Sequence, residues 1–362
     1  MINLRGHTPQ HLITADGKPF NMDRILKIEI TDAAGFESDE LVITLDDSFP
    51  QIARPREGAK LAVSLGFKET GLIAMGTFVF EEFGREGLER TATLIAKAAD
   101  HAASLKEPKT RSWDTQTLGA VVRKVAGEHG LAAAISDKLA SQAIKFIAQT
   151  EESDQHFLTR LGKRVGAIIA PKDGRLLVTE RRSGKTASGQ SMPKIEVTLG
   201  RLVNAGAYSV QLKPRSRYSK VIANWQDRAS GTVKRFTFQA AEKGPSITLR
   251  EVFQDEADAS RAAKAKATDL RSGEGELALE LIGDPLARAE APLSVSGVSL
   301  DVDGEWIAST VTHVWDYGEG GGATTTVEAE FGKEKEEAKK GTKAAPKSRK
   351  PAGEYVSVLD RN

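Results

Sequence analysis

The Gly-Lys-Thr sequence at residues 184–186 is the segment of this chain that comes nearest to a ligand-binding motif. It matches the end of a phosphate-binding loop, in which backbone N–H groups and a lysine hold phosphate oxygens. That loop needs another glycine five residues before Gly184, and this chain has Thr179 there. The loop also needs a following helix to offer its N-terminus to the phosphate, and none is expected here. We therefore interpret residues 183–192 as a polar loop or linker.

Histidines and cysteines give no candidate metal site. The chain has six histidines, and none forms the His-Glu-x-x-His pair that places two imidazoles on one helix face. His7 and His11 are four residues apart, but no third ligand accompanies them. His129 and His156 are expected on helices, as surface or packing residues. Because the chain has no cysteine, disulfides and thiolate sites are excluded. We predict no metal and no cofactor.

Acidic and hydroxyl side chains give no catalytic pattern either. Glu151, Glu152 and Asp154 cluster where a helix is expected to start, and negative charge there complements the helix dipole. Ser153 lacks the Gly-x-Ser-x-Gly context of an activated nucleophile. The sequence therefore predicts no catalytic residue, and we expect the chain not to be an enzyme.

The first hundred residues alternate apolar and polar side chains with a period of two, which is typical of half-buried strands. The alternation is clearest at residues 28–30, 41–45 and 61–67, and turn-forming Gly, Asp and Pro residues separate these runs. A further strand pair is expected at residues 76–83 and 90–96. Several short strands with regular turns predict an antiparallel barrel or sandwich.

Residues 112–170 change to a helical period. The apolar stripe of the first predicted helix consists of Leu118, Val121, Val122 and Val125. Asp114 or Thr115 is expected to cap its start, and Gly130 to end it. A second helix is expected to end at Gly166. This stretch therefore predicts a small mixed α/β region.

The β pattern returns after residue 193 and continues to Phe331. One Ala-rich helix, capped by Asp255, is expected to interrupt it over residues 256–271. The four tryptophans are expected as core or interface anchors rather than as ligand platforms. They are Trp113, Trp225, Trp306 and Trp315.

These patterns predict an α+β protein that is mainly β. We expect a first β-barrel (tube-like) domain at 1–105, an α/β insert at 106–192, and a second β-barrel domain with one helix at 193–332. Residues 333–362 are expected to be a basic flexible tail. The two β-barrel domains are expected to be similar and antiparallel, although their sequences show no clear repeat.

Charge and hydropathy argue against nucleic-acid binding and membrane insertion. The net charge is +1, and residues 333–350 hold eight Lys/Arg and three Glu, so the rest of the chain sums to about −4. The chain as a whole thus lacks the basic signature of a nucleic-acid-binding protein. No run of 18 apolar residues occurs, so no membrane insertion is expected.

Three segments carry a family resemblance. KTRSWDTQTL at 109–118 leads into a predicted helix that ends with EHGL at 128–131. QTEESDQHFLTRL follows at 149–161, and its Glu-Ser-Asp-x-x-Phe-Leu-x-Arg-Leu stretch is the most specific mark. The third segment is LELIGDP at 279–285, after the Ala-rich helix. Together they resemble the late control D protein family of tailed phages, whose module also forms the N-terminal part of the VgrG proteins of type VI secretion. The resemblance spans residues 5–332.

The resemblance implies a structural baseplate hub of a contractile phage or phage-like tail. In that family, two similar β-barrels per subunit give a trimer a pseudo-sixfold ring, which adapts the hexameric tail tube to the trimeric central spike and forms part of the delivery channel. The implied partners are two further copies of the chain, the trimeric spike protein, the tail tube or tube-initiator protein, baseplate wedge proteins and the tape-measure protein. DNA is implied only as passing cargo. The implied location is the tail baseplate of the virion, after assembly in the host cytoplasm.

Two expectations complete this interpretation. Because no oligosaccharide-binding-like, β-helix or lysozyme-like domain follows the last predicted strand, we expect the spike on a separate polypeptide. The alternative function is a tail-associated peptidoglycan hydrolase or a cell-wall-binding module centred on residues 106–192. Such an enzyme would need a carboxylate pair or a metal triad in that insert.

Overall fold

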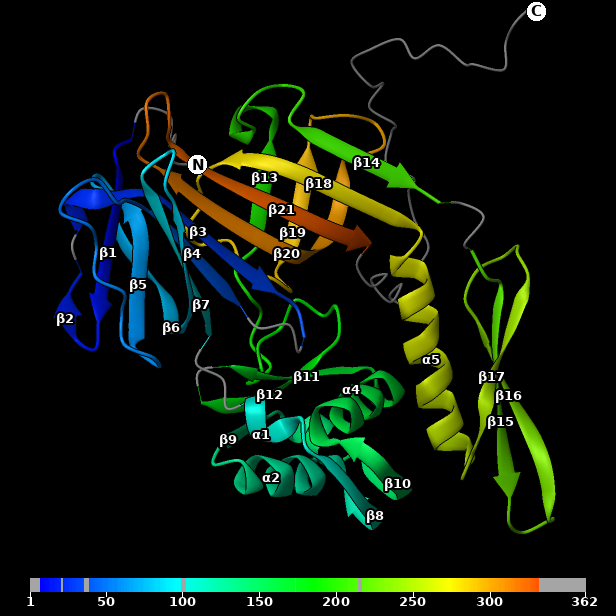
Figure 1. The fold of residues 1–362 in the computed structure, drawn as a ribbon. Coiled ribbons are helices and arrows are strands. Elements are labelled where there is room, and N and C mark those ends of the chain that lie inside the picture. Colours follow the sequence, from blue (N-terminus) through cyan, green and yellow to red (C-terminus); the bar gives the residue numbers. More distant parts are fainter. Residues whose placement is uncertain are drawn as a thin grey trace, which may run out of the picture.

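The computed structural model describes residues 7–20, 22–35, 39–98, 102–172, 174–213 and 217–331. The predicted tail at 333–362 lies outside these residues. Figure 1 shows two β regions side by side, with a smaller mixed α/β region beneath them in this view. Strands dominate the two β regions and the insert mixes helices with strands, as the sequence predicts.

The first β region is an antiparallel arrangement of neighbouring strands. Its elements are β1 (Pro9–Ala15), β2 (Lys18–Pro19), η1 (Met22–Arg24), β3 (Ile25–Ala33), β4 (Glu40–Asp46), β5 (Lys60–Phe67), β6 (Gly71–Glu86) and β7 (Thr91–Ala98). Leu41, Ile43 and Leu45 of β4 are buried, while the residues between them are partly exposed. The period-two pattern therefore marks the core-facing side correctly.

The α/β insert follows. Its elements are α1 (Ala102–Leu105), β8 (Pro108–Thr117), α2 (Leu118–Glu128), β9 (Ala132–Ile135), α3 (Asp137–Ala140), β10 (Ala143–Ser153), α4 (Asp154–Val165), β11 (Ala167–Lys172) and β12 (Arg175–Glu180). The predicted stripe of α2 is fully buried, and Gly166 ends α4 in the left-handed conformation at φ 72°. The expected cap at Asp114 or Thr115 is wrong. Residues 108–117 pair with β10 as a strand, so Thr117 caps α2 by accepting the Ala120 N–H.

The second β region carries a helix-covered subsheet. Its elements are β13 (Ile195–Thr198), η2 (Leu199–Arg201), β14 (Tyr208–Leu212), β15 (Lys220–Asp227), β16 (Thr232–Gln239), β17 (Ser246–Phe253), α5 (Glu256–Ser272), β18 (Gly275–Ile282), β19 (Pro292–Ser296), β20 (Gly304–Asp316) and β21 (Ala323–Phe331). Strands β15, β16 and β17 form a separate sheet. Small residues of α5, such as Ala259 and Ala263, pack with Val221 and Ala223 of β15. Asp255 caps α5 as predicted, by accepting the Asp258 N–H.

One hydrogen-bonded ladder joins the two β regions. Strand β20 of the second region pairs antiparallel with β3 of the first, so a single sheet runs β14-β18-β21-β20-β3-β4-β7-β6-β5-β1-β2. Trp315 of β20 is fully buried in the core of the first region, and its indole N–H donates to the Gly66 carbonyl at 3.1 Å. The two regions are therefore parts of one continuous sheet and not separate domains.

The two β regions repeat the same strand pattern. Strands β3, β4, β5, β6 and β7 correspond in order and pairing to β14, β18, β19, β20 and β21. The register agrees residue by residue: Ile43 pairs with Leu94 in the first region, and Leu279 pairs with Val327 in the second. The sequence reveals no such repeat, because equivalent positions hold different side chains on the same backbone.

Two backbone irregularities recur at equivalent places in this repeat. Strand β6 carries one extra residue, Glu81, opposite β7, and β20 carries Ser309 in the same position opposite β21. Five residues before each bulge stands a glycine with positive φ, Gly76 at 130° and Gly304 at 152°. Glycine is required there because side chains disfavour this conformation. The repeat thus extends to the local geometry.

A buried carboxylate ties the insert to both β regions. Asp32 at the end of β3 accepts from Lys172 of β11 at 2.6 Å and from the Ala289 N–H at 2.9 Å. Burial raises the pKa of Asp32, but the neighbouring Lys172 ammonium outweighs this and holds it below its usual range. The insert is therefore anchored where the β3–β20 ladder ends. The predicted domain limits at 105, 192 and 332 stay a prediction.

His313 of β20 lies fully buried within this ladder, opposite Ile30 of β3. Its Nε2 is 3.2 Å from the Ala287 carbonyl oxygen, and its Nδ1 is 3.2 Å from the Thr325 hydroxyl. Because a carbonyl only accepts, Nε2 carries the proton and Nδ1 accepts from Thr325. Burial lowers the pKa of His313 to about 4.

The buried neutral histidine predicts a specific loss of stability in acid. The unfolded chain gains a proton on His313 below about pH 6.5, whereas the folded chain does so only near pH 4. The wild-type protein should therefore lose up to about 3 kcal/mol of unfolding free energy, relative to His313→Gln, between those pH values. Urea unfolding of both proteins across pH 4–7 measures this difference. Parallel stability curves would contradict it.

Candidate channel face and charged cluster

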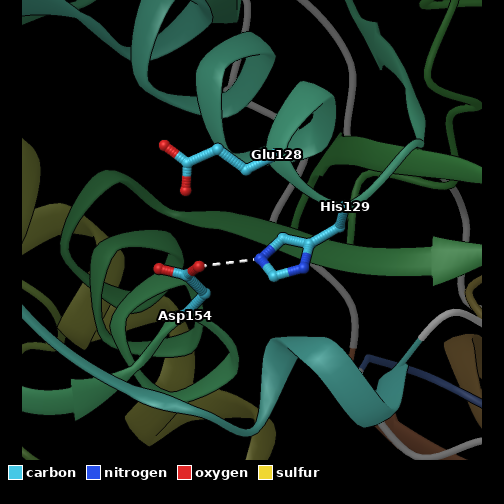
Figure 2. A group of neighbouring side chains, drawn as sticks. All are labelled: Glu128, His129 and Asp154. Carbon is cyan, nitrogen blue, oxygen red and sulfur yellow. Dashed lines mark hydrogen bonds and ion pairs between the residues drawn. The ribbon is translucent and has the colours of Figure 1, made fainter.

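A cluster of charged side chains lies in the insert where α2 ends and α4 begins. Figure 2 shows Glu128, His129 and Asp154, with His129 Nε2 at 2.8 Å from an Asp154 carboxylate oxygen. Lys109 and Arg111 of β8 also donate to Asp154, and both form ion pairs with Glu128. Two cations thus balance two carboxylates around the His129 imidazole, whose side chain is only 4% exposed.

The same cluster contains a serine-histidine-aspartate relay. Ser104 Oγ lies 2.7 Å from His129 Nδ1, and His129 in turn bonds to Asp154. In a hydrolase the aspartate strengthens the histidine as a base. Here the Asp154 carboxylate is already neutralised by Lys109 and Arg111, so little of its charge acts on the imidazole. The arrangement therefore fits a structural charge network.

A metal ion fits this cluster poorly. Glu128, His129 and Asp154 offer ligand atoms within 4.8 Å of one another, and they are the group of that kind found in the described part of the chain. The two carboxylates, however, already bind the Lys109 ammonium and the Arg111 guanidinium. A cation would have to displace or repel both groups, which are held close by the β8–β10 pairing.

Burial and hydrogen bonding act in opposite directions on the Asp154 carboxyl group. Burial raises its pKa, but hydrogen bonds from Lys109, His129 and Gln149, together with the Arg111 charge, outweigh this and lower the pKa to about 2. Asp154 therefore stays ionised and holds β8, α2 and α4 together.

The other candidate residues from the sequence make packing, hydrogen-bond or helix-capping contacts. His11 Nδ1 lies 2.5 Å from the Tyr317 hydroxyl, and His7 packs on the Phe67 ring. Ser153 caps α4 by accepting the His156 N–H. Trp113, Trp306 and Trp315 are buried in cores, as expected of anchors.

Two further expectations have outcomes in this part of the chain. Residues 184–186 lie in a turn region after β12, as the interpretation of residues 183–192 as a loop predicts. The interpretation of Asp154 as one of three helix-dipole carboxylates was incomplete. It starts α4, but its partners come from β8 and α2, which sequence spacing does not reveal.

The joined sheet presents one continuous, mainly polar face across the β3–β20 junction, with the partly exposed Val42, Ile95 and Val314 in one of its rows. Thr326, Thr312 and Thr31 form one row of neighbours across β21, β20 and β3 on this face. The residues of the opposite face are buried in the cores. The carboxylates of the polar face include Glu29, Glu40, Asp46, Glu276, Glu280, Asp316 and Glu328. Its lysines include Lys27, Lys97 and Lys213, which are paired with Glu29, Glu81 and Glu276. The face is therefore acidic.

Comparisons with known proteins identify the family. A family model described as phage tail baseplate hub (GPD) matches residues 79–318. This chain belongs to that family. The probable baseplate hub protein of Escherichia phage P2 is 30% identical, over 89% of this chain and 93% of the relative. The chain is therefore a baseplate hub protein, a part of the tail baseplate of the virion, as the sequence resemblance implied.

Solved structures share the fold of this baseplate hub protein. The 43 kDa tail protein of prophage MuSo2 from Shewanella oneidensis has a TM-score of 0.64 at 17% identity, covering 90% of this chain and 98% of the other. A component of the type VI secretion system of E. coli has a TM-score of 0.52 at 12% identity, covering 89% and 77%. These likenesses support the predicted mainly-β hub fold. The relatives give no support to the alternative of a hydrolase in the insert. Among the described helices, none is long and apolar enough to cross a membrane.

The charge network of the insert makes a testable prediction. Asp154→Asn should lower the unfolding free energy by roughly 3 kcal/mol at neutral pH, because it leaves Lys109 and Arg111 partly uncompensated. Since the folded pKa lies below the unfolded one, this contribution is present above about pH 4 and is lost as pH falls towards 2. Thermal and urea unfolding at pH 7 and pH 2.5 measure both effects.

A matched control comes from the same predicted acidic trio. Glu151 is exposed, so Glu151→Gln should change the unfolding free energy by less than about 0.5 kcal/mol. If Asp154→Asn is as mild as this control at pH 7, the cluster does not stabilise the insert.

Proposed function

We propose that this hub protein works as a homotrimeric adaptor between the hexameric tail tube and the trimeric central spike. The observation that carries this proposal is the internal repeat: each chain holds two β regions with the same strand order, register and bulges, joined edge to edge. Three copies would offer six equivalent repeats to a sixfold tube, while the chain itself keeps threefold symmetry for the spike.

The acidic face suits a channel wall in such a ring. A wall with excess carboxylates repels a polyanion such as DNA, so DNA would pass without binding. The row of Thr326, Thr312 and Thr31 between the carboxylates offers hydroxyl groups to the cargo. We propose that this face lines the delivery channel, with DNA or the tape-measure protein as passing cargo.

The remaining parts of the proposal concern partners and chemistry. The tail tube or tube-initiator protein, the wedge proteins and a separate trimeric spike are the proposed partners. Residues 1–105 and 193–332 would be the ring-forming domains, with 106–192 as an insert between them. We propose a purely structural role, with no catalytic residue, because the carboxylate of the Ser104–His129–Asp154 group already forms ion pairs with Lys109 and Arg111.

Mass photometry with and without the spike protein tests the adaptor role. We expect a species of three times the chain mass, and electron micrographs of it should show a threefold ring with a pseudo-sixfold outline. The proposal would be wrong if the chain stays monomeric at micromolar concentration and forms no trimer when the spike protein is added. A peptidoglycan zymogram on the same sample should show no lysis.

A further inference from the structure

In the order of the joined sheet, the second repeat runs β14-β18-β21-β20 and the first runs β3-β4-β7-β6. The internal ladder pairs β20, the last strand of the second repeat in this order, with β3, the first strand of the first repeat. Two edges of the same kinds are left over. In the described part of the chain, β14 pairs with β18 alone, and β6 pairs with β5 no further than Val79.

Exposure marks these two edges as incomplete copies of the internal junction. Ile28 and Ile30 of β3 are buried, but their equivalents on β14, Tyr208 and Val210, are only partly buried. The next core-facing residue, Leu212, is 45% exposed. Apolar side chains at such sheet edges are uncommon in a finished monomer, because they invite pairing with another chain.

The last strand shows the same contrast. Val311 and Trp315 of β20 are fully buried, Val311 in the core of its own region and Trp315 in the core of the neighbouring repeat. Their equivalents are Phe83, which is partly buried, and Gly87, whose neighbour Leu88 is 98% exposed. Each unpaired edge therefore lacks the cover that the internal ladder provides.

We propose that the β6 edge at residues 82–86 of one copy pairs antiparallel with β14 of a second copy, in the register of the β3–β20 ladder. This inference rests on the trimer of the proposed function and names the contact that would close it. The internal ladder sets Thr310 opposite Ala33 and Val314 opposite Glu29. Transferred through the repeat, it sets Glu82 opposite Lys213, Phe83 opposite Leu212, and Glu86 opposite Ser209.

Two of the residue pairs brought together in this register are complementary. Glu82 carries a charge opposite to that of Lys213, which it would share with Glu276 of the same chain as Lys213. Phe83 and Leu212 are both apolar. Directly opposed pairs of these kinds stabilise antiparallel strands. None of them was used to choose the register, which comes from backbone equivalence alone. Their fit is therefore independent support.

Backbone groups on β14 also face the open edge. The Lys213 N–H donates to the Glu274 carbonyl, and the Glu280 N–H donates to the Ala207 carbonyl. Since bonding alternates along an antiparallel strand, Val210 and Leu212 direct their N–H and C=O groups away from β18. On β3 the equivalent residues, Ile30 and Asp32, pair with β20. The edge therefore has the donors and acceptors that the register needs.

The contact is head-to-tail, because a last strand meets a first strand of another copy. Such heterologous contacts close into a ring when the rotation allows it. Internal and external junctions would then alternate around the ring, and the acidic face would continue through all of them. Strand pairing would also fix the register and the relative direction of the two copies.

Engineered cysteines test the register directly, since the natural chain has none. Glu86→Cys and Ser209→Cys would face each other at a non-hydrogen-bonded pair, where Cα atoms lie about 4.5 Å apart and a disulfide fits. With the full chain assembled with the spike protein, oxidation should give covalently linked trimers on a non-reducing gel. The control, Glu82→Cys with Ser209→Cys, is four residues out of register, about 13 Å apart, and should give no trimer band.

The outcomes separate this inference from the proposed function. A reduced Glu86→Cys/Ser209→Cys protein that is trimeric by mass photometry but does not cross-link would overturn the strand junction and leave the adaptor role intact. A protein that forms no trimer in any state would overturn both. Cross-linking of the control pair as efficiently as the test pair would also overturn the register.

A substitution at the exposed edge gives a second readout. Leu212→Lys should leave the chain folded, because the side chain is 45% exposed, yet it should weaken trimer formation about tenfold by placing a charge against Phe83. Leu300→Lys, at a 57% exposed leucine in the turn before β20, is the matched control and should form trimers like the wild type. Equal trimer formation by both variants would contradict the junction.

Discussion

The antiparallel ladder between β3 and β20 is the interaction on which the rest of the structure depends. It is a run of backbone hydrogen bonds, each contributing about 1 kcal/mol net, between strands that are nearly 300 residues apart in sequence. The ladder places Trp315 in the core of the other β region. It also ends beside Asp32, whose carboxylate binds Lys172 of the insert. The position of all three parts of the chain therefore follows from one strand pairing.

Much of the local structure could be predicted from the sequence. Alternation at residues 41–45 marks a strand because a pleated backbone sends successive side chains to opposite faces. The stripe from Leu118 to Val125 marks a helix for the analogous reason, and Asp255 and Gly166 mark helix ends by their capping chemistry. In each case the physical cause acts within a few residues of the signal.

Features that depend on distant pairing could not be predicted in the same way. Residues 108–117 form a strand because β10 lies beside them, although they are polar and carry no clear alternation. Asp154 forms two ion pairs because β8 brings Lys109 and Arg111 to it from more than 40 residues away. The repeat stayed hidden because Arg85 and His313 occupy equivalent backbone positions with unrelated side chains. The family resemblance supplied the functional conclusion that composition and spacing left open.

The subsheet β15–β17 with α5 stands where the first repeat has only a short connection. Residues 34–39 link β3 to β4, whereas residues 213–274 link the equivalent strands β14 and β18. The elaboration sits in a connection, so its length can change without disturbing the register of the strands on either side. It also makes the two repeats distinguishable from outside while their wall strands stay alike. In a ring of alternating repeats, this module would recur at every second position. A partner with threefold rather than sixfold symmetry could then bind at one kind of repeat and not at the other.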